Sequence, residues 1–169
     1  MSGPQDESTT LACGLAGEIV RTFGVVRLCV LGTSMVPSIL PGDLISVQRA
    51  DLSEIAPGEI VLYMRDNRFF VHRVVTRAGN QDDPRLITRG DRLLHNDPSV
   101  SSSELLGRVT SIRTHDGRRQ REIRSAISVS VWEQIFIQVL RTSDRATSLY
   151  LRLARYLPSF FSRGVACRA

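Results

Sequence analysis

The sequence of 169 residues contains no lysine, so all 22 of its basic side chains are arginines. Chemistry that depends on a lysine amine, such as a serine–lysine dyad, is therefore excluded. Against 17 acidic residues, the arginines leave a formal net charge of +5. A basic balance suits nucleic acid or an anionic membrane surface. The arginines are spread along the chain without helix-turn-helix or zinc-finger spacing, so we expect no nucleic-acid partner.

Cysteine is also scarce. Cys13, Cys29 and Cys167 are widely spaced and form no CxxC pair. Their number and spacing argue against a disulfide framework and against a zinc site. We therefore expect neither a metal ion nor a cofactor.

Long apolar runs are missing as well. No segment reaches the roughly 18 consecutive apolar residues of a transmembrane helix. The short apolar stretch 11–17 has no basic flank before it, which a cleaved secretory signal requires. We expect no membrane-spanning helix and no cleavable signal peptide, and hence a cytoplasmic or peripheral membrane location.

The middle of the chain alternates short apolar runs with turn residues. Proline–glycine pairs predict turns at 41–43 and 57–59, and Asp66-Asn67 predicts a hairpin. Strands are expected at 25–31, 44–47, 60–64, 68–75, 86–88 and 106–112, with the last of these closing the core. Many short strands with tight turns indicate a mostly β fold.

Helical periodicity flanks this region on both sides. Apolar residues four positions apart predict a short helix within 10–23. From residue 128 the apolar spacing changes to that of amphipathic helices accompanied by arginines, with an interruption at Pro158. The segment 128–163 could contact a membrane surface through arginines and bulky apolar side chains. The alternatives are that it packs on the β domain or mediates dimerisation.

A serine follows the first predicted strand at a sharp turn. Ser34-Met35-Val36-Pro37, with Gly42-Asp43 after it, resembles the nucleophile motif of the type I signal peptidases, which are S24/S26-like serine peptidases. Motifs similar to the other three of that family follow in the family's order at 57–61, 71–74 and 88–97. The resemblance covers roughly residues 28 to 112.

The third of these motifs indicates which base the resemblance implies. Val71-His72-Arg73 is similar to the archaeal and endoplasmic-reticulum branch, whose members use histidine where bacterial members use lysine. The resemblance therefore implies a serine-type endopeptidase that cleaves a signal or leader peptide after a small residue, with Ser34 as nucleophile and His72 as general base. Histidine suits this role because its ordinary pKa of about 6.5 lies near neutral pH. The partner would be a peptide or precursor protein.

Two carboxylates are candidates for orienting His72. The resemblance favours Asp97, with Asp91 as the alternative. For the oxyanion and the substrate we expect the backbone N–H of Ser34, with Thr33 and Met35 beside it. The chain departs from the family pattern at Gly32, where many members carry serine, and at 92–93, where asparagines are usual.

These observations divide the chain into three regions. We expect a tail and short helix at 1–24, a signal-peptidase-like β catalytic domain at 25–115, and an amphipathic helical region at 125–169. The alternative function is a catalytically inactive peptide-binding or regulatory module on the same fold. That reading predicts decay of the site, whereas serine, histidine and aspartate are all present.

Overall fold

The computed structural model describes residues 17–20, 22–117, 120–123 and 144–156. A short N-terminal helix, visible at 17–20 and 22–23, precedes a seven-stranded antiparallel sheet, and a short helix follows it. The elements after the first helix are β1 (Val25–Cys29), β2 (Leu44–Gln48), η1 (Leu52–Glu54), β3 (Ile60–Arg65), β4 (Arg68–Gly79), β5 (Pro84–Arg89), β6 (Leu105–Arg113), β7 (Gln120–Glu122) and α3 (Asp144–Tyr156). The predicted mostly β class is confirmed.

Three expectations about the elements need adjustment. The strand expected at 25–31 ends at Cys29, two residues early. The strand at 106–112 is not the last, because β7 follows it and pairs antiparallel with β6. Strand β4 continues four residues beyond the predicted end, to Gly79, because its distal half pairs with β5 across a tight turn. Of the helix predicted within 10–23, residues 10–16 lie outside the described part of the chain.

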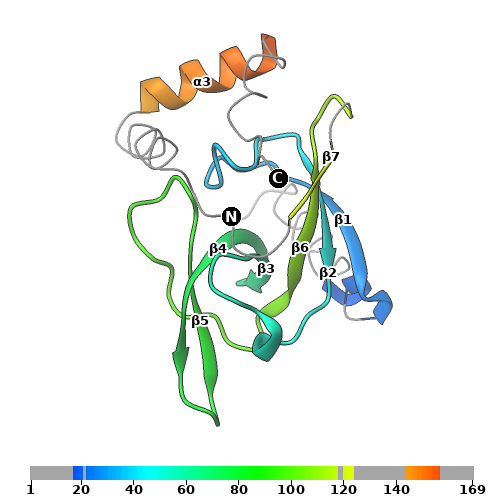
Figure 1. Cartoon of the computed structure of the whole chain (residues 1–169), viewed down its shortest axis with the longest axis vertical. Coiled ribbons are helices and arrows are strands. Elements are labelled where there is room, and N and C mark those ends of the chain that lie inside the picture. The colour runs from blue at the N-terminus through cyan, green and yellow to red at the C-terminus, as the bar shows by residue number, and fades with distance from the viewer. Residues whose placement is uncertain (1–16, 21, 118–119, 124–143, 157–169) are drawn as a thin grey trace, which may run out of the picture.

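The strands lie in the order β1-β2-β6-β3-β4-β5. β6 is the shared strand, because it pairs with β2 along one edge and with β3 and then β7 along the other. Register shifts interrupt the pairing between Ser46 and Val47, Leu62 and Tyr63, and Val74 and Thr76. Such bulges increase the local twist of a sheet. Figure 1 shows the β4–β5 hairpin at one end of the molecule and α3 at the other.

The β3–β4 hairpin fixes the register that places the histidine. Asp66 and Asn67 both adopt positive φ, at 50° and 56°. Two successive residues of this conformation form the tight turn that matches the twist of paired strands, and Asp and Asn tolerate it. The resulting register places His72 opposite Val61.

Both faces of β3 are buried. Ile60 and Leu62 belong to one apolar cluster together with Met35, whereas Val61 and Tyr63 belong to a second on the opposite face. This explains why β3 reads as a continuous apolar run rather than an alternating one. Full burial of each such side chain stabilises the folded state by about 1.5–3 kcal/mol. The packing of β3 therefore holds the neighbouring strand β4 in place.

Helix α3 has two different faces. Thr147 is buried and Tyr150 is half-buried; burial, together with the charge of Asp43, raises the pKa of Tyr150. The other face exposes arginine and leucine side chains. No helix within the described residues is long and apolar enough to cross a membrane. Of the amphipathic helical region predicted at 125–169, residues 125–143 and 157–169 lie outside the described part of the chain.

Candidate active site

The predicted nucleophile lies in the loop that connects β1 to β2. The loop is closed at its base by hydrogen bonds from Val30 N–H to the Asp43 carbonyl (2.9 Å) and from Gly42 N–H to the Val30 carbonyl (2.7 Å). The side chain of Met35, 1% exposed, anchors the loop in the core. Ser34, directly before this anchor, is half-buried. The loop therefore holds the serine at the surface of a packed region.

His72 lies on β4 beneath this loop. Its side chain is buried, with 4% of the residue exposed. Its Nε2 atom lies 3.1 Å from Ser34 Oγ, and its Nδ1 atom lies 2.6 Å from Asp97 Oδ2. The rings of Tyr63 and Phe70 contact the imidazole edge-on, with centroids 6.2 and 6.1 Å away. The structure thus brings the three predicted residues into one hydrogen-bonded chain.

Two hydrogen bonds with Thr88 on β5 hold Asp97 in place. The backbone N–H of Asp97 donates to the Thr88 carbonyl at 2.8 Å, and Thr88 Oγ1 donates to Asp97 Oδ2 at 2.7 Å. Burial raises the pKa of Asp97, but hydrogen bonds from His72, Thr88 and Tyr63 and the charge of His72 together bring it below its ordinary value. The carboxylate is therefore ionised at neutral pH.

An ionised Asp97 can only accept hydrogen bonds, which determines the tautomer of the imidazole. The proton of neutral His72 lies on Nδ1, where it is donated to Asp97. The lone pair on Nε2 is then free to accept the hydroxyl proton of Ser34. This is the arrangement in which a histidine can act as a base toward a serine.

Asp91, the alternative acid, contacts arginine instead. Arg73 binds it through two hydrogen bonds, Nε to Oδ1 at 2.8 Å and Nη2 to Oδ2 at 2.7 Å. The same guanidinium donates to the Gly58 carbonyl at 2.9 Å and to Ser38 Oγ at 3.2 Å. Arg73 therefore ties the Asp91 turn to the 57–59 turn and to the Ser34 loop.

Gly90 approaches the nucleophile more closely than the sequence indicated. A Cβ atom at this position would lie 2.8 Å from the Ser34 carbonyl oxygen and 3.0 Å from Ser34 Cβ. Next to it, Arg92 N–H donates to the same Ser34 carbonyl at 2.9 Å. The loop after β5 therefore fixes the backbone of Ser34 directly. The glycine of the Gly90-Asp91 motif was the only signal of this contact in the sequence.

A second arginine, which the sequence did not single out, holds the segment after Asp97. Arg65 Nε lies 2.5 Å from Glu104 Oε1, and Arg65 Nη2 donates to the Ser99 carbonyl at 2.9 Å. The guanidinium also lies 5.5 Å from the centre of the Tyr63 ring. These contacts join residues more than thirty positions apart, so spacing in the sequence could not reveal them.

The other predicted site residues have less defined surroundings. Thr33 is half-buried, and its carbonyl accepts a hydrogen bond from Val36 N–H at 3.2 Å. Met35 is 1% exposed and belongs to the core, so it supports the loop and does not face a substrate. Among the described residues, no group of three His, Cys, Asp or Glu side chains could hold a metal ion.

The chain is similar in sequence to known peptidases. The chain is 42% identical over 74 residues to the signal peptidase complex catalytic subunit SEC11 of Fusarium vanettenii, a match covering 42% of the chain and 43% of that protein. It is 35% identical over 77 residues to the corresponding subunit of Neurospora crassa, covering 44% of the chain and 45% of that protein. The chain thus matches less than half the length of these relatives. Residues 5–109, more than half of the chain, match the Peptidase S24-like family, and the protein belongs to this family of serine peptidases.

Proposed function

We propose that this protein is a serine endopeptidase in which Ser34 is the nucleophile, His72 the general base and Asp97 the residue that orients the base. The observation that supports this most strongly is the continuous chain from Ser34 Oγ through both imidazole nitrogens to Asp97, with separations of 3.1 and 2.6 Å. Membership of the family supplies the class of chemistry.

The proposed reaction has two halves. Ser34 Oγ attacks the scissile carbonyl carbon while its proton moves to His72 Nε2, which gives a tetrahedral oxyanion. The Ser34 N–H, with Thr33 beside it, is the proposed donor to that oxyanion. Collapse breaks the C–N bond, and Nε2–H protonates the leaving amine. A water molecule, deprotonated by the same nitrogen, then hydrolyses the serine ester and restores the hydroxyl.

The proposed substrate is a signal or leader peptide on a precursor protein, cut after a small residue. Support comes from the relatives, whose name identifies them as catalytic subunits of a signal peptidase complex. The part of this chain that matches the family, residues 5–109, contains all the residues assigned a chemical role above.

The test is acylation by a penem-type lactam, read as an increase in intact mass. We expect an adduct on the wild type over about pH 6 to 9, and none on Ser34→Ala or His72→Ala. His95→Ala is the matched control, because His95 is an exposed histidine in the loop beside Asp97. Fluorogenic peptides with alanine before the cleaved bond then test the substrate class.

The competing function is a module that binds peptides without cleaving them. It predicts that folded wild-type protein forms no lactam adduct at any pH in this range, yet binds leader peptides in a fluorescence anisotropy titration. An adduct that survives Ser34→Ala would also reject the assignment of the nucleophile.

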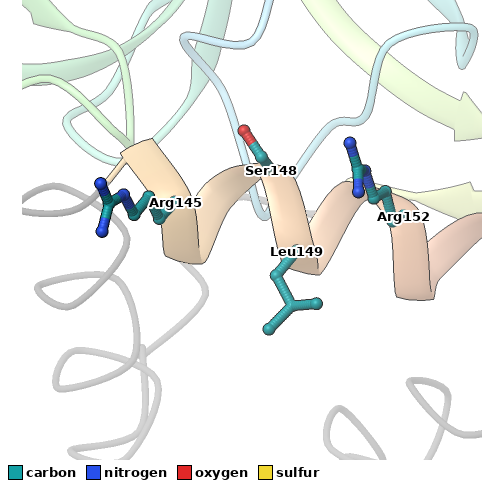
Figure 2. A pocket seen from close by; sticks show the side chains of 4 residues that line it. All are labelled: Arg145, Ser148, Leu149 and Arg152. Atoms are coloured by element: carbon teal, nitrogen blue, oxygen red, sulfur yellow. The ribbon is translucent and has the colours of Figure 1, made fainter.

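We further propose that the C-terminal segment 128–163 contacts anionic lipid headgroups. In its described part, α3, helical spacing places Arg145, Leu149, Arg152 and Leu153 on one exposed face. Figure 2 shows Arg145, Leu149 and Arg152, with Ser148, lining a shallow hollow there. Paired arginines beside leucines suit a helix lying among phosphates.

Cosedimentation with vesicles tests this contact. We expect binding to vesicles of phosphatidylcholine and phosphatidylglycerol that weakens with salt and with the double substitution Arg145→Glu/Arg152→Glu. Arg27→Glu/Arg113→Glu, on the sheet, is the control for net charge. Equal binding of both doubly substituted proteins would reject α3 as the contact.

A further inference from the structure

Two buried hydroxyl groups lie behind the Asp97 carboxylate. Thr88 is 0% exposed, and it contacts Asp97 twice, through its carbonyl and through Oγ1. Tyr63 is 1% exposed and stands on β3, two strands away from β5. Its hydroxyl is a donor to Asp97, an interaction that lowers the pKa of that carboxyl group. Neither residue touches Ser34 in any of these contacts.

The contacts converge on one carboxylate oxygen. Asp97 Oδ2 accepts from His72 Nδ1 at 2.6 Å and from Thr88 Oγ1 at 2.7 Å. Hydrogen bonds to a charged acceptor are stronger than those between neutral groups. They favour the ionised carboxylate and fix the direction in which it faces the imidazole. Burial disfavours the ionised carboxylate, so the charged form of Asp97 depends on these hydrogen-bond donors.

Tyr63 can act as a donor throughout the working range of pH. Burial raises the pKa of Tyr63 to about 12. The phenol therefore remains protonated wherever a serine–histidine pair could operate. Its ring also stacks on Phe70 and contacts His72 edge-on, so one side chain touches both the acid and the base.

We propose that Thr88 and Tyr63 are positioning residues that keep Asp97 ionised and aligned with His72 Nδ1, and thereby set the lower pH limit of the reaction. The inference rests on the proposed function, in which His72 is the base. Loss of either hydroxyl leaves a less solvated carboxylate, which holds a proton on the Asp97–His72 pair up to higher pH. The base is then blocked over more of the acid range.

Thr88→Val and Tyr63→Phe remove the hydroxyls while preserving shape. We expect each to slow lactam acylation about tenfold at pH 7 and to move the midpoint of the acid limb up by about one pH unit. Lactam affinity should be unchanged, and Thr88→Ser should restore most of the rate. Thr110→Val is the control, since this strand threonine donates to the Ser46 carbonyl, away from the site.

The second measurement needs no activity. In proton NMR of the full chain, we expect the His72 Nδ1–H resonance to shift in Thr88→Val and Tyr63→Phe but not in Thr110→Val. Unchanged resonances with unchanged pH profiles in both variants would overturn the proposal. Because this signal is independent of acylation, a wild type that reacts with no lactam would reject the proposed function and leave the positioning role to be decided by NMR.

Combining Thr88→Val with Asp97→Asn distinguishes a positioning role of Thr88 from a simple packing role. If Thr88 acts through the carboxylate, Thr88→Val should shift the Nδ1–H signal in the wild type, and it should cost less thermal stability in Asp97→Asn than in the wild type. A packing role predicts the same loss of thermal stability in both backgrounds and no change in the wild-type signal. That second result would also overturn the proposal.

Discussion

Two carboxylates six positions apart in one loop have opposite surroundings. Asp91 is bound by the guanidinium of Arg73, whereas Asp97 is bound by the imidazole of His72. The two partners are neighbours on β4, and successive side chains of a strand point to opposite faces. One strand therefore supplies a permanently charged partner on one face and a titratable partner on the other. The Arg73–Asp91 pair therefore holds neighbouring loops together, whereas the His72–Asp97 pair is the one to which the proposed reaction assigns the base.

The largest expected effect separates the two carboxylates by rate. We expect Asp97→Asn to lower the acylation rate about 10⁴-fold, because an amide can stabilise the wrong imidazole tautomer. The thermal midpoint should change little, since the shape is retained. Intact-mass kinetics and differential scanning fluorimetry on the same samples check both parts. A near-wild-type rate in this variant, together with a collapse of the rate in folded Asp91→Asn, would exchange the two assignments.

Asp91→Asn should act on stability instead. Asp91 is buried, and its replacement leaves the Arg73 guanidinium without a charged partner. We expect the free energy of unfolding to fall by about 2–4 kcal/mol, with less than a tenfold loss of rate in the protein that remains folded. Urea denaturation measures the change in the free energy of unfolding. Arg85→Ala, which breaks an exposed pair with Asp83, is the control and should change stability by less than about 1 kcal/mol.

Gly90→Ala tests how closely the loop supports the nucleophile. The added methyl group would meet the Ser34 carbonyl oxygen at 2.8 Å, so the Ser34 backbone must move. A displacement of this kind costs about 10²-fold in rate. Gly32→Ala is a matched control, because a Cβ atom there meets nothing within 4 Å. Equal rates for both variants would show that Gly90 does not position the serine.

The smallest effect concerns the Arg65–Glu104 pair beyond Asp97. The hydrogen bond from Arg65 lowers the pKa of Glu104 from 4.5 to about 2. The stabilisation is therefore fully present above about pH 4.5 and is lost as the pH falls toward about 2. We expect Glu104→Gln to reduce the free energy of unfolding by about 1 kcal/mol at pH 7 and by nothing below pH 2. Urea melts at several pH values will check this, and a constant difference across the range would contradict it.

Much of this arrangement could be predicted from local patterns. Apolar runs and turn residues located six of the seven strands, and the Asp66-Asn67 hairpin gave the register of His72. Strand β7 was missed because Gln120–Glu122 has no apolar pattern and forms only through pairing with β6.

The supporting contacts of the site could not be predicted. The sequence identified Ser34, His72 and both aspartates as candidates, but which aspartate faces the imidazole depends on how the 90–97 loop returns along β5. Thr88 is an ordinary strand residue in the sequence, and Tyr63 an ordinary core residue. Their roles arise only when β3, β5 and the loop meet in space.

The loop between the two carboxylates is fastened at both ends. Asp91 is tied to Arg73, and Asp97 to Thr88, while the bridge between Leu86 and Val100 secures the chain beyond. The intervening residues 92–96 therefore do not have to preserve the position of the acid. Leu94 among them is 54% exposed. The side chains of this segment can therefore change without moving either carboxylate.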